Sequence, residues 1–518
     1  MAFRPLAPST ARFSHLVFQP RERVFAWFER PGAVARLTPG LLPMTPVVEA
    51  ENLRDGMTVF DMPARAGWEA RHDPEEYVRG HRFADYVANQ PWRGALGWRH
   101  VHTFEDVRGP GEDRPAWWTN VVDEVTSRVP ERALSGVFAY RGAVLDGDLA
   151  ALDRLTGRLG DGFAPKTIAV TGASGTVGSA LSGLLSTAGH DVVKLIRPAN
   201  GTAKHPPQPG ARVWDPDNPA PDLLDGIDVL IHLAGAPIAG RFTDKHLAKV
   251  RDSRVGPSRK LAELVAASRV EAVVSASAVG YYGADRGTEL LDESAPPGSG
   301  PLADIVRDWE AAWAPAREAG IRVTCVRTGL VQAGGGGLLP ILAGITSTGL
   351  GGRLGDGGQW FPWIALDDLL DVYHRAAVDP ALEGAVNAVA PGGVDNAEYT
   401  RTLARVLRRP AAIPVPKVAP SLVLGGRGAE ELAFANQRAI PAALQAAGHE
   451  FRFPDLEKAL RHELLRAGGA PPPTAAPSRR RASRRTDDRK HADMTSISYP
   501  RRGYVIHLEC KMHAKLAQ

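Results

Sequence analysis

The chain has 518 residues, too many for one ordinary domain, and this length predicts about two to four domains. Hydrophobic residues make up 44% and charged residues 23%, which is ordinary for a soluble globular protein. The formal net charge of +4 comes from residues 470–518, whose eleven Lys or Arg and four Asp or Glu give +7, so the other 469 residues carry −3. The folded part is therefore not expected to bind nucleic acid.

The cysteine content and the length of the apolar runs indicate the cellular compartment of the protein. Two cysteines, Cys325 and Cys510, cannot form a disulfide framework, so a reducing compartment is expected. The N-terminal stretch MAFRPLAPSTARFSHLVF has no continuous apolar core of signal-peptide length. No run approaches the roughly 18 apolar residues that a membrane helix needs. We expect a cytoplasmic protein without membrane contact.

Residues 1–155 are expected to form an α+β domain. The stretch FQPRERVFAWFERPGAVARLTPG places Val24, Trp27 and Phe28 at helical spacing and ends the helix at a Pro-Gly pair. GWRHVHTFEDV alternates as a strand does. One early helix followed by many short strands predicts a curved antiparallel sheet wrapped around helices.

The sequence pattern of the chain changes at about residue 160. The strand-like runs TIAVT, DVVKLI, ARVWD, DVLIHLA, AVVSAS and RVTCVR alternate with helical stretches over residues 166–394, which predicts an α/β domain with a doubly wound parallel sheet. Residues 395–466 look mostly helical and are expected to cap that sheet. Residues 467–518, rich in Pro, Ser, Ala and Arg, are expected to be a disordered basic tail.

A strand, a glycine-rich turn and an amphipathic helix follow one another in TIAVTGASGTVGSALSGLL. Gly172 permits the tight turn, Gly175 lets the backbone approach a pyrophosphate, and Gly178 lets the helix pack on the sheet. The phosphates then lie at the positive N-terminus of the helix. A dinucleotide site is predicted, and a glycine-rich turn without a ligand is the alternative. Its expected residues are Thr171, Gly172, Ser174, Gly175, Thr176, Val177 and Gly178, with Leu233, Ala234 and Gly235 from HLAGAPI.

The end of the second strand indicates which dinucleotide binds. An NAD site has Asp or Glu there for the ribose 2′-hydroxyl. This strand ends in KLIRP, and Asp191 lies at its opposite end. Arg197 lies where a 2′-phosphate would sit, and a guanidinium matches a phosphate well. NADP(H) is therefore expected in preference to NAD(H), with a surface arginine as the alternative.

Further motifs follow the glycine turn along the chain: LAGAPIAGRFT, SASAVGYYG, RTGLVQAGGGGLLP, GLGGRLGDGGQWFPWIALDDLL and ANQRAIPAALQAAGHEFRFPDLEKAL. Together they resemble the extended short-chain dehydrogenase/reductase (SDR) superfamily, and within it the YfcH-like group of NAD-dependent-epimerase-like proteins. The resemblance covers about residues 166–466. It implies a Rossmann-type fold followed by a helical DUF1731-type domain.

The first segment carries motifs of another kind. PRERVFAWFERPGAVARLTPG and RHDPEEYVRGHRF look like a START-type (SRPBCC) module of the polyketide-cyclase class. That resemblance implies a helix-grip fold and a hydrophobic ligand within residues 1–155.

The SDR resemblance implies a catalytic Ser and a Tyr-x-x-x-Lys pair, whose Lys lowers the pKa of the Tyr. Ser277 matches the serine, and Tyr282 matches a family tyrosine that is not the catalytic one. The pair should fall on the helix PLADIVRDWEAAW, where Leu302 and Val306 occupy its positions. No Tyr or Lys occurs in residues 284–320, so the usual proton-transfer pair is absent.

Tyr281 is the candidate that could replace this pair, because it lies where the strand exits toward the nicotinamide crevice. An aromatic packing residue is the alternative. Arg327 and Thr328 end another strand at the carboxyl edge of the sheet and are expected to contact substrate. A solvated helix face is the simplest explanation of the acidic residues Asp304, Asp308 and Glu310.

Two histidines recur at strand spacing in the first segment. His100 and His102 lie two apart and so point to one face, as metal ligands do. Without a third ligand in view, a packed or polar strand face is expected, and no metal site is predicted.

The expected function is that of an NADP(H)-dependent oxidoreductase or epimerase-like enzyme with atypical catalysis, acting on a small apolar or sugar-like substrate. One alternative is a non-catalytic NADP(H)-binding sensor or assembly protein. Another is a carrier of a hydrophobic ligand through residues 1–155. The oligomeric state is not predicted from the sequence.

Overall fold

The computed structural model describes residues 7–63, 66–107, 118–197, 210–411, 414–416 and 418–467. The tail expected from residue 467 onward lies outside the described residues, except for its first residue. Among the described helices, none is both long enough and apolar enough to span a membrane.

An antiparallel sheet of seven strands forms the N-terminal segment, in the order β1-β7-β6-β5-β4-β3-β2. Its strands are β1 (Ser9–Val17), β2 (Thr45–Val48), β3 (Met57–Asp61), β4 (Gly67–His72), β5 (Arg82–Val87), β6 (Arg99–Val107) and β7 (Trp118–Ser127). Its helices are α1 (Arg21–Glu29), α2 (Ala33–Leu37), α3 (Trp92–Leu96) and α4 (Glu131–Leu159). The α+β expectation with an antiparallel sheet is confirmed.

Apolar spacing explains why α1 and α4 pack on this sheet. Val24, Trp27 and Phe28 of α1 are buried, as their spacing predicts. On α4, Tyr140 and Val144 lie one helical turn apart and join the same core, together with residues from β5, β6 and β7.

A parallel sheet of seven strands forms the centre of the chain, in the order β10-β9-β8-β11-β12-β14-β18. The strands are β8 (Thr167–Thr171), β9 (Asp191–Ile196), β10 (Arg212–Val213), β11 (Val229–His232), β12 (Ala272–Ala278), β14 (Arg322–Thr328) and β18 (Gly384–Ala388). All six strands expected from the sequence are present. The strand order reverses between β8 and β11, and ligands of such sheets bind in the crevice at this point.

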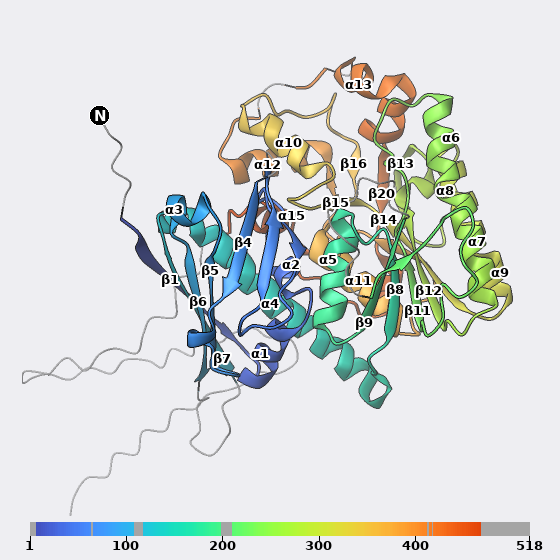
Figure 1. Cartoon of the computed structure of the whole chain (residues 1–518). Helices are drawn as coiled ribbons and strands as arrows, with labels where there is room; N and C mark the ends of the chain where they lie inside the picture. The colour runs from blue at the N-terminus through green and yellow to red at the C-terminus, as the bar shows by residue number, and fades with distance from the viewer. Residues whose placement is uncertain are drawn as a thin grey trace, which may run out of the picture. The chain divides into compact units, whose positions relative to one another are not determined.

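Helices cover both faces of the parallel sheet, because its strands are apolar on both sides. They are α5 (Thr176–Thr187), α6 (Asp244–Asp252), α7 (Val255–Ala266), α8 (Pro301–Ala311), α9 (Ala314–Glu318) and α11 (Leu366–Val378). Figure 1 shows α5 and α11 on one face and α7, α8 and α9 on the other. Ile168 and Val170 of β8 face the first layer, and Ala169 between them faces the second.

Further short helices and paired strands, drawn from residues 285–463, lie beside the parallel sheet. The helices are α10 (Leu339–Ser347), α12 (Asn396–Leu407), α13 (Val418–Gly428), α14 (Ala442–Ala446) and α15 (Leu456–Glu463). The paired strands are β13 (Asp285–Leu291) with β20 (Asn436–Ala439), β15 (Leu330–Gln332) with β17 (Trp363–Ala365), and β16 (Trp360–Phe361) with β19 (Val394–Asp395). Residues 395–466 are therefore mostly helical, as expected, but they also supply β19 and β20. The domain boundaries drawn from the sequence stay predictions.

A buried charge cluster joins the N-terminal segment to the parallel-sheet segment. Arg36 of α2 lies 2.7 Å from Asp148 of α4 and 2.8 Å from Asp367 of α11. Arg452 lies 2.8 Å from the same Asp148 and 2.6 Å from Asp371. These side chains are all buried, so each charge is stabilised by its ion-pair partners instead of by water.

Close backbone contact accompanies this cluster. A Cβ on Gly32, at the start of α2, would lie 2.5 Å from the Cα of Gly183 in α5. Only glycines allow such an approach. The helix that leaves the glycine-rich turn therefore packs directly on the N-terminal segment.

Candidate functional site

The glycine-rich turn has the geometry of an anion site. Gly172 adopts a φ of +68°, which favours glycine, and its carbonyl accepts a hydrogen bond of 3.0 Å from the N–H of Gly175. Helix α5 begins at Thr176 with no side chain capping its N-terminus. Ser174, Gly175 and Thr176 are exposed. The first turn of α5 is therefore exposed and has no capping side chain, although Gly336 lies against the Thr176 side chain. Uncapped N–H groups of this kind are where phosphates bind.

Gly175 and Gly178 have different surroundings. A Cβ on Gly175 would meet only the carbonyl oxygen of Gly172, at an ordinary 3.4 Å. A Cβ on Gly178 would overlap that same oxygen. Gly178 is therefore required by packing, whereas Gly175 leaves space beside the turn.

Thr171 supports the turn from below. Its side chain is fully buried, and its Oγ1 accepts hydrogen bonds from the N–H groups of Leu233 and Ala234 at 3.1 and 3.2 Å and lies 2.8 Å from His232 Nδ1. These bonds hold the segment HLAGAPI beside the glycine turn. Val177 is half-buried and packs on the core of the sheet. The contact of a cofactor with the glycine turn and with HLAGAPI stays a prediction.

Arg254 is a candidate anion ligand that the sequence did not reveal. Its side chain is buried and lies against Gly235, where a Cβ would be 2.9 Å from the guanidinium carbon. It donates to the carbonyl of Val250 and to Ser253 Oγ, and among the described residues no carboxylate forms an ion pair with it. Burial lowers the pKa of Arg254 to about 10. Spacing alone does not distinguish it from the other arginines of this helical region.

Arg197 lies at the expected place. It directly follows β9, which pairs in parallel with β8, so Arg197 is at the same sheet edge as the glycine turn. Its side chain is exposed. The position is compatible with a 2′-phosphate contact, which stays a prediction.

A second cluster joins β12, α8 and β14. Ser277 Oγ donates a 2.6 Å hydrogen bond to Glu310 Oε1. Arg327 Nε and Nη2 each donate a 2.9 Å bond to the two oxygens of the same carboxylate. The Glu310 side chain is only 14% exposed. The expectation of a solvated helix face is therefore wrong for Glu310, because its carboxylate is bound from two strands.

The other two acidic residues of α8 agree with the expectation of a solvated helix face. The side chains of Asp304 and Asp308 are 53% and 30% exposed and pair with Arg307 and Arg251. Glu310 lies one helical turn beyond Val306, on the stripe that begins at Leu302 and faces the sheet. This position is the signal that could have identified Glu310 as a site residue.

The two tyrosines follow β12 in a 3₁₀ turn, Val279–Tyr282. The ring of Tyr281 lies flat against Arg327, with the guanidinium carbon 3.5 Å from the ring centre. Tyr282 OH accepts a 3.1 Å bond from Arg327 Nη1 and lies 2.8 Å from Asn387 Oδ1. Burial raises the pKa of Tyr282. The structure thus places Ser277, Tyr281, Glu310 and Arg327 together.

The predicted substrate contacts have other partners here. Arg327 is 4% exposed, and its donors bind Glu310, Tyr282 and the carbonyl of Glu293. Thr328 Oγ1 donates to the carbonyl of Val326. Arg327 therefore orders the cluster around Ser277, and a contact of either residue with substrate stays a prediction.

The N-terminal sheet encloses a cavity of about 370 Å³. Its walls are mostly apolar and include Phe28, Leu37, Phe60, Trp68, Phe83 and Phe138. Helix α2, which packs on α5, also contributes to this wall. The cavity is large enough for a small apolar molecule.

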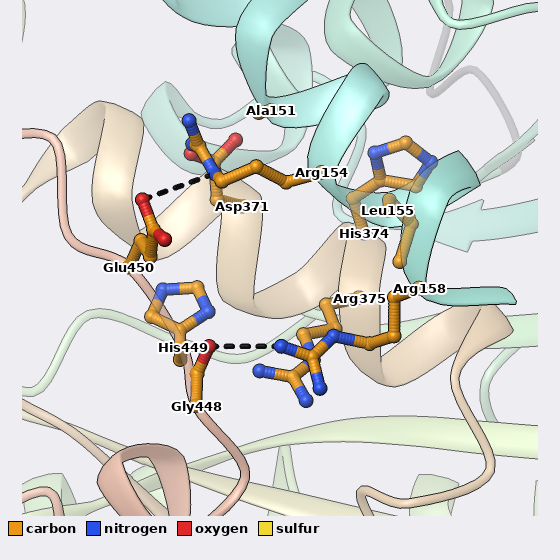
Figure 2. A pocket seen from close by; sticks show the side chains of 10 residues that line it. All are labelled: Ala151, Arg154, Leu155, Arg158, Asp371, His374, Arg375, Gly448, His449 and Glu450. Carbon is orange, nitrogen blue, oxygen red and sulfur yellow. Dashed lines mark hydrogen bonds and ion pairs between the residues drawn. The ribbon is translucent and has the colours of Figure 1, made fainter. Parts of the chain in front are cut away.

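Another cavity, of about 350 Å³, lies between α4, α11 and residues 448–450. Figure 2 shows Arg154 and Arg158 reaching from α4 toward Glu450 and the carbonyl of Gly448. Arg375 pairs with Asp379 at 2.8 Å. Because these charges have partners in the protein, the cavity is part of the junction between segments and is not a candidate active site.

Two family profiles match the chain. Residues 168–388 match the NAD dependent epimerase/dehydratase family, and residues 415–463 match DUF1731, a domain of unknown function. The epimerase family protein Mb2239 of Mycobacterium bovis is 37% identical over 311 residues, which span 59% of this chain and all of that protein.

Solved structures agree with this assignment. A nucleoside-diphosphate sugar epimerase from Corynebacterium glutamicum is 45% identical with a TM-score of 0.76, and the match covers 88% of this chain and 90% of that one. The human epimerase family protein SDR39U1, isoform 2, solved with NADPH, is 30% identical with a TM-score of 0.52 and covers 58% of this chain and 99% of its own. The chain therefore belongs to the NAD dependent epimerase/dehydratase family, and it carries a DUF1731 domain after its Rossmann-type sheet.

Proposed function

We propose that this protein is an NADP(H)-dependent oxidoreductase of the extended SDR type with epimerase-like chemistry. The observation that carries the proposal is the exposed glycine turn before the uncapped N-terminus of α5, at the point where the strand order reverses. The NADPH in the human relative supports the choice of cofactor. When bound, the cofactor supplies hydride transfer.

Arg197 is the residue to which we assign the preference for NADP(H). Replacing Arg197 with Ala is expected to weaken NADPH binding by about 10- to 100-fold, the loss of a charge-assisted hydrogen bond, and to leave NADH binding nearly unchanged. Binding can be followed by the fluorescence of the reduced nicotinamide. Arg259→Ala, a change of another exposed arginine, is the matched control. Equal losses for both nucleotides would refute the phosphate role of Arg197.

The Ser277 cluster is the proposed site of proton transfer. Because Ser277 Oγ donates its hydrogen to Glu310, its lone pairs can accept a hydrogen bond from a substrate hydroxyl. A proton that leaves this hydroxyl can pass through Ser277 to the Glu310 carboxylate, which Arg327 holds in place. Tyr281, at the edge of the same cluster, is the alternative proton carrier. This pathway requires no Tyr-x-x-x-Lys pair.

Replacing Glu310 with Gln should test this pathway. We expect kcat to fall by about 10²- to 10⁴-fold while the Kd for NADPH stays unchanged, because Gln cannot accept the proton. Activity would be measured as NADPH formed from NADP⁺ with a panel of nucleoside-diphosphate sugars and as NADPH consumed with small carbonyl compounds. Epimerisation returns the hydride and leaves the NADPH absorbance unchanged, so it would be measured by chromatography of the sugar products. The name of the Corynebacterium relative motivates the sugars.

The control for Glu310→Gln is Asp304→Asn on the exposed face of α8. Melting temperatures of both variants separate lost chemistry from lost folding. Full activity of Glu310→Gln would remove Glu310 from the pathway. Tight NADPH binding with no turnover over the whole panel would instead favour the non-catalytic sensor.

The apolar cavity favours a second function, transport or presentation of a hydrophobic ligand by the N-terminal segment. An antiparallel sheet that precedes the long helix α4 and encloses an apolar cavity supports the START-like, helix-grip interpretation. Organic extraction of the purified full chain, followed by mass spectrometry, tests it. A stoichiometric apolar molecule is expected, and none would be found if the cavity served only packing.

A further inference from the structure

Three side chains of the N-terminal sheet bring metal-ligand atoms together. His100 and His102 alternate onto one face of β6, and Asp85 of β5 is paired in register with His100. Asp85 Oδ2 lies 3.7 Å from His100 Nδ1 and 3.6 Å from His102 Nε2. One donor atom from each of the three residues lies within 4.8 Å of the others. Asp85 is thus a candidate third ligand, which sequence spacing could not supply.

These separations fit a shared cation better than direct hydrogen bonds. A hydrogen bond between a ring nitrogen and a carboxylate oxygen is about 2.7–3.2 Å long. Two ligands placed about 2.1 Å from one ion, at tetrahedral or wider angles, are roughly 3.4–3.7 Å apart. Asp85, His100 and His102 have the spacing of the second case.

A fourth residue, Asp123 of β7, orients both imidazoles from behind. Its Oδ1 is hydrogen-bonded to His100 Nε2 at 2.8 Å and lies 2.9 Å from His102 Nδ1. These are the ring nitrogens opposite those that face Asp85. With the hydrogen of His100 Nε2 directed at Asp123, His100 Nδ1 carries a lone pair toward Asp85. The same tautomer of His102, with its hydrogen on Nδ1, leaves a lone pair on Nε2. Metal sites use the same arrangement, in which an outer carboxylate fixes the tautomer of each ligating histidine.

The apolar cavity gives such a site open positions. Asp85, His100 and His102 all line it, together with Arg141 of α4. Structural zinc sites are closed by four protein ligands, whereas sites with three protein ligands keep a position for another molecule. The two carboxylates, Asp85 and Asp123, balance the charge of a divalent ion, and Arg141 then adds one positive charge. An anionic oxygen of a bound molecule would neutralise this charge.

We propose that Asp85, His100 and His102 bind one divalent transition-metal ion at the polar end of the N-terminal cavity, with Asp123 as the positioning residue. Two imidazoles and one carboxylate suit zinc or ferrous iron. The open positions face the apolar walls. The molecule that completes the coordination is therefore an apolar compound with an anionic oxygen, such as a carboxylic acid.

The test is titration of the metal-stripped full chain with Zn²⁺, with Fe²⁺ under anaerobic conditions, and with Co²⁺ as a spectroscopic probe. We expect one tight equivalent in the wild-type protein that is lost in His100→Gln/His102→Gln. Asp85→Asn should weaken it, and Asp123→Asn should weaken it by about 10- to 100-fold. The zinc and iron titrations distinguish the two metals.

Controls separate this site from other metal-binding groups. His491, His507, Cys510 and His513 are present in every variant, so only the difference from wild type is assigned to the cavity. His72→Gln changes another buried imidazole of the cavity wall, whose Nδ1 is bound to the carbonyl of Asn52, and should retain the metal. Equal metal content in wild type and the double variant would overturn the proposal. A Co²⁺ spectrum that is the same in wild type and in the double variant would also overturn it. In that case His102, with a hydrogen on each ring nitrogen, would bridge Asp85 and Asp123.

Discussion

Replacing Gly175 with Val is expected to abolish NADPH binding while the protein stays folded. The φ of Gly175 is −78°, which any residue adopts, and a Cβ there meets no atom closer than 3.4 Å. The change costs about 1 kcal/mol or less, the difference between Gly and Val at a helix N-cap. The branched side chain would occupy the space in front of the N–H groups of α5, where the pyrophosphate is proposed to lie. Fluorescence titration with NADPH and circular dichroism measure the two effects.

Gly178→Ala is the contrasting change in the same turn. Its Cβ would overlap the Gly172 carbonyl oxygen, so we expect loss of stability and, as a consequence, loss of binding. A Gly175→Val protein that bound NADPH as wild type does would show that the turn is only structural. The two variants therefore separate the proposed ligand space beside Gly175 from the packing requirement at Gly178, three residues further along the same motif.

Replacing Arg36 with Ala is expected to lower the free energy of unfolding by about 3–5 kcal/mol, because it leaves buried carboxylates without their partner. Arg36 is 1% exposed and binds Asp148 and Asp367. Urea denaturation of the full chain measures the change. Arg12→Ala, at an exposed pair with Glu124, should change stability by less than about 1 kcal/mol. Similar effects of the two changes would contradict the role of the cluster.

The same cluster predicts a dependence on pH. Burial raises the pKa of Asp367, but the charges of Arg36 and Arg452 and the hydrogen bond from His462 hold it well below its usual value. A lowered folded-state pKa stabilises the protein above the unfolded pKa of about 4, and this stabilisation is lost as the pH falls through the lower folded value. The loss on acidification should be smaller in Arg36→Ala.

Local patterns predicted the parts of the fold that depend on neighbouring residues. The six strand runs, helix α1 and the glycine turn were all identified because apolar periodicity and glycine spacing are properties of short segments. The family resemblance over residues 166–466 added the expectation of a missing Tyr-x-x-x-Lys pair, and α8 indeed presents Leu302 and Val306 as buried apolar residues.

Residues whose role depends on tertiary pairing were missed. Glu310 was assigned to a solvated face because its partners, Ser277 and Arg327, are 33 and 17 residues away and lie on two strands. Asp85 was not connected to His100 because their pairing depends on the register of β5 and β6. Such contacts become visible only when the strand order is known.

The central claim is that the glycine turn, α5 and Arg197 form an NADP(H) site, and calorimetric titration of the full chain with NADPH and separately with NADH tests it most directly. We expect saturable binding of about one NADPH per chain and NADH binding weaker by at least about tenfold. Equal affinity for both nucleotides would contradict the assignment of Arg197. No binding of either would contradict the site itself.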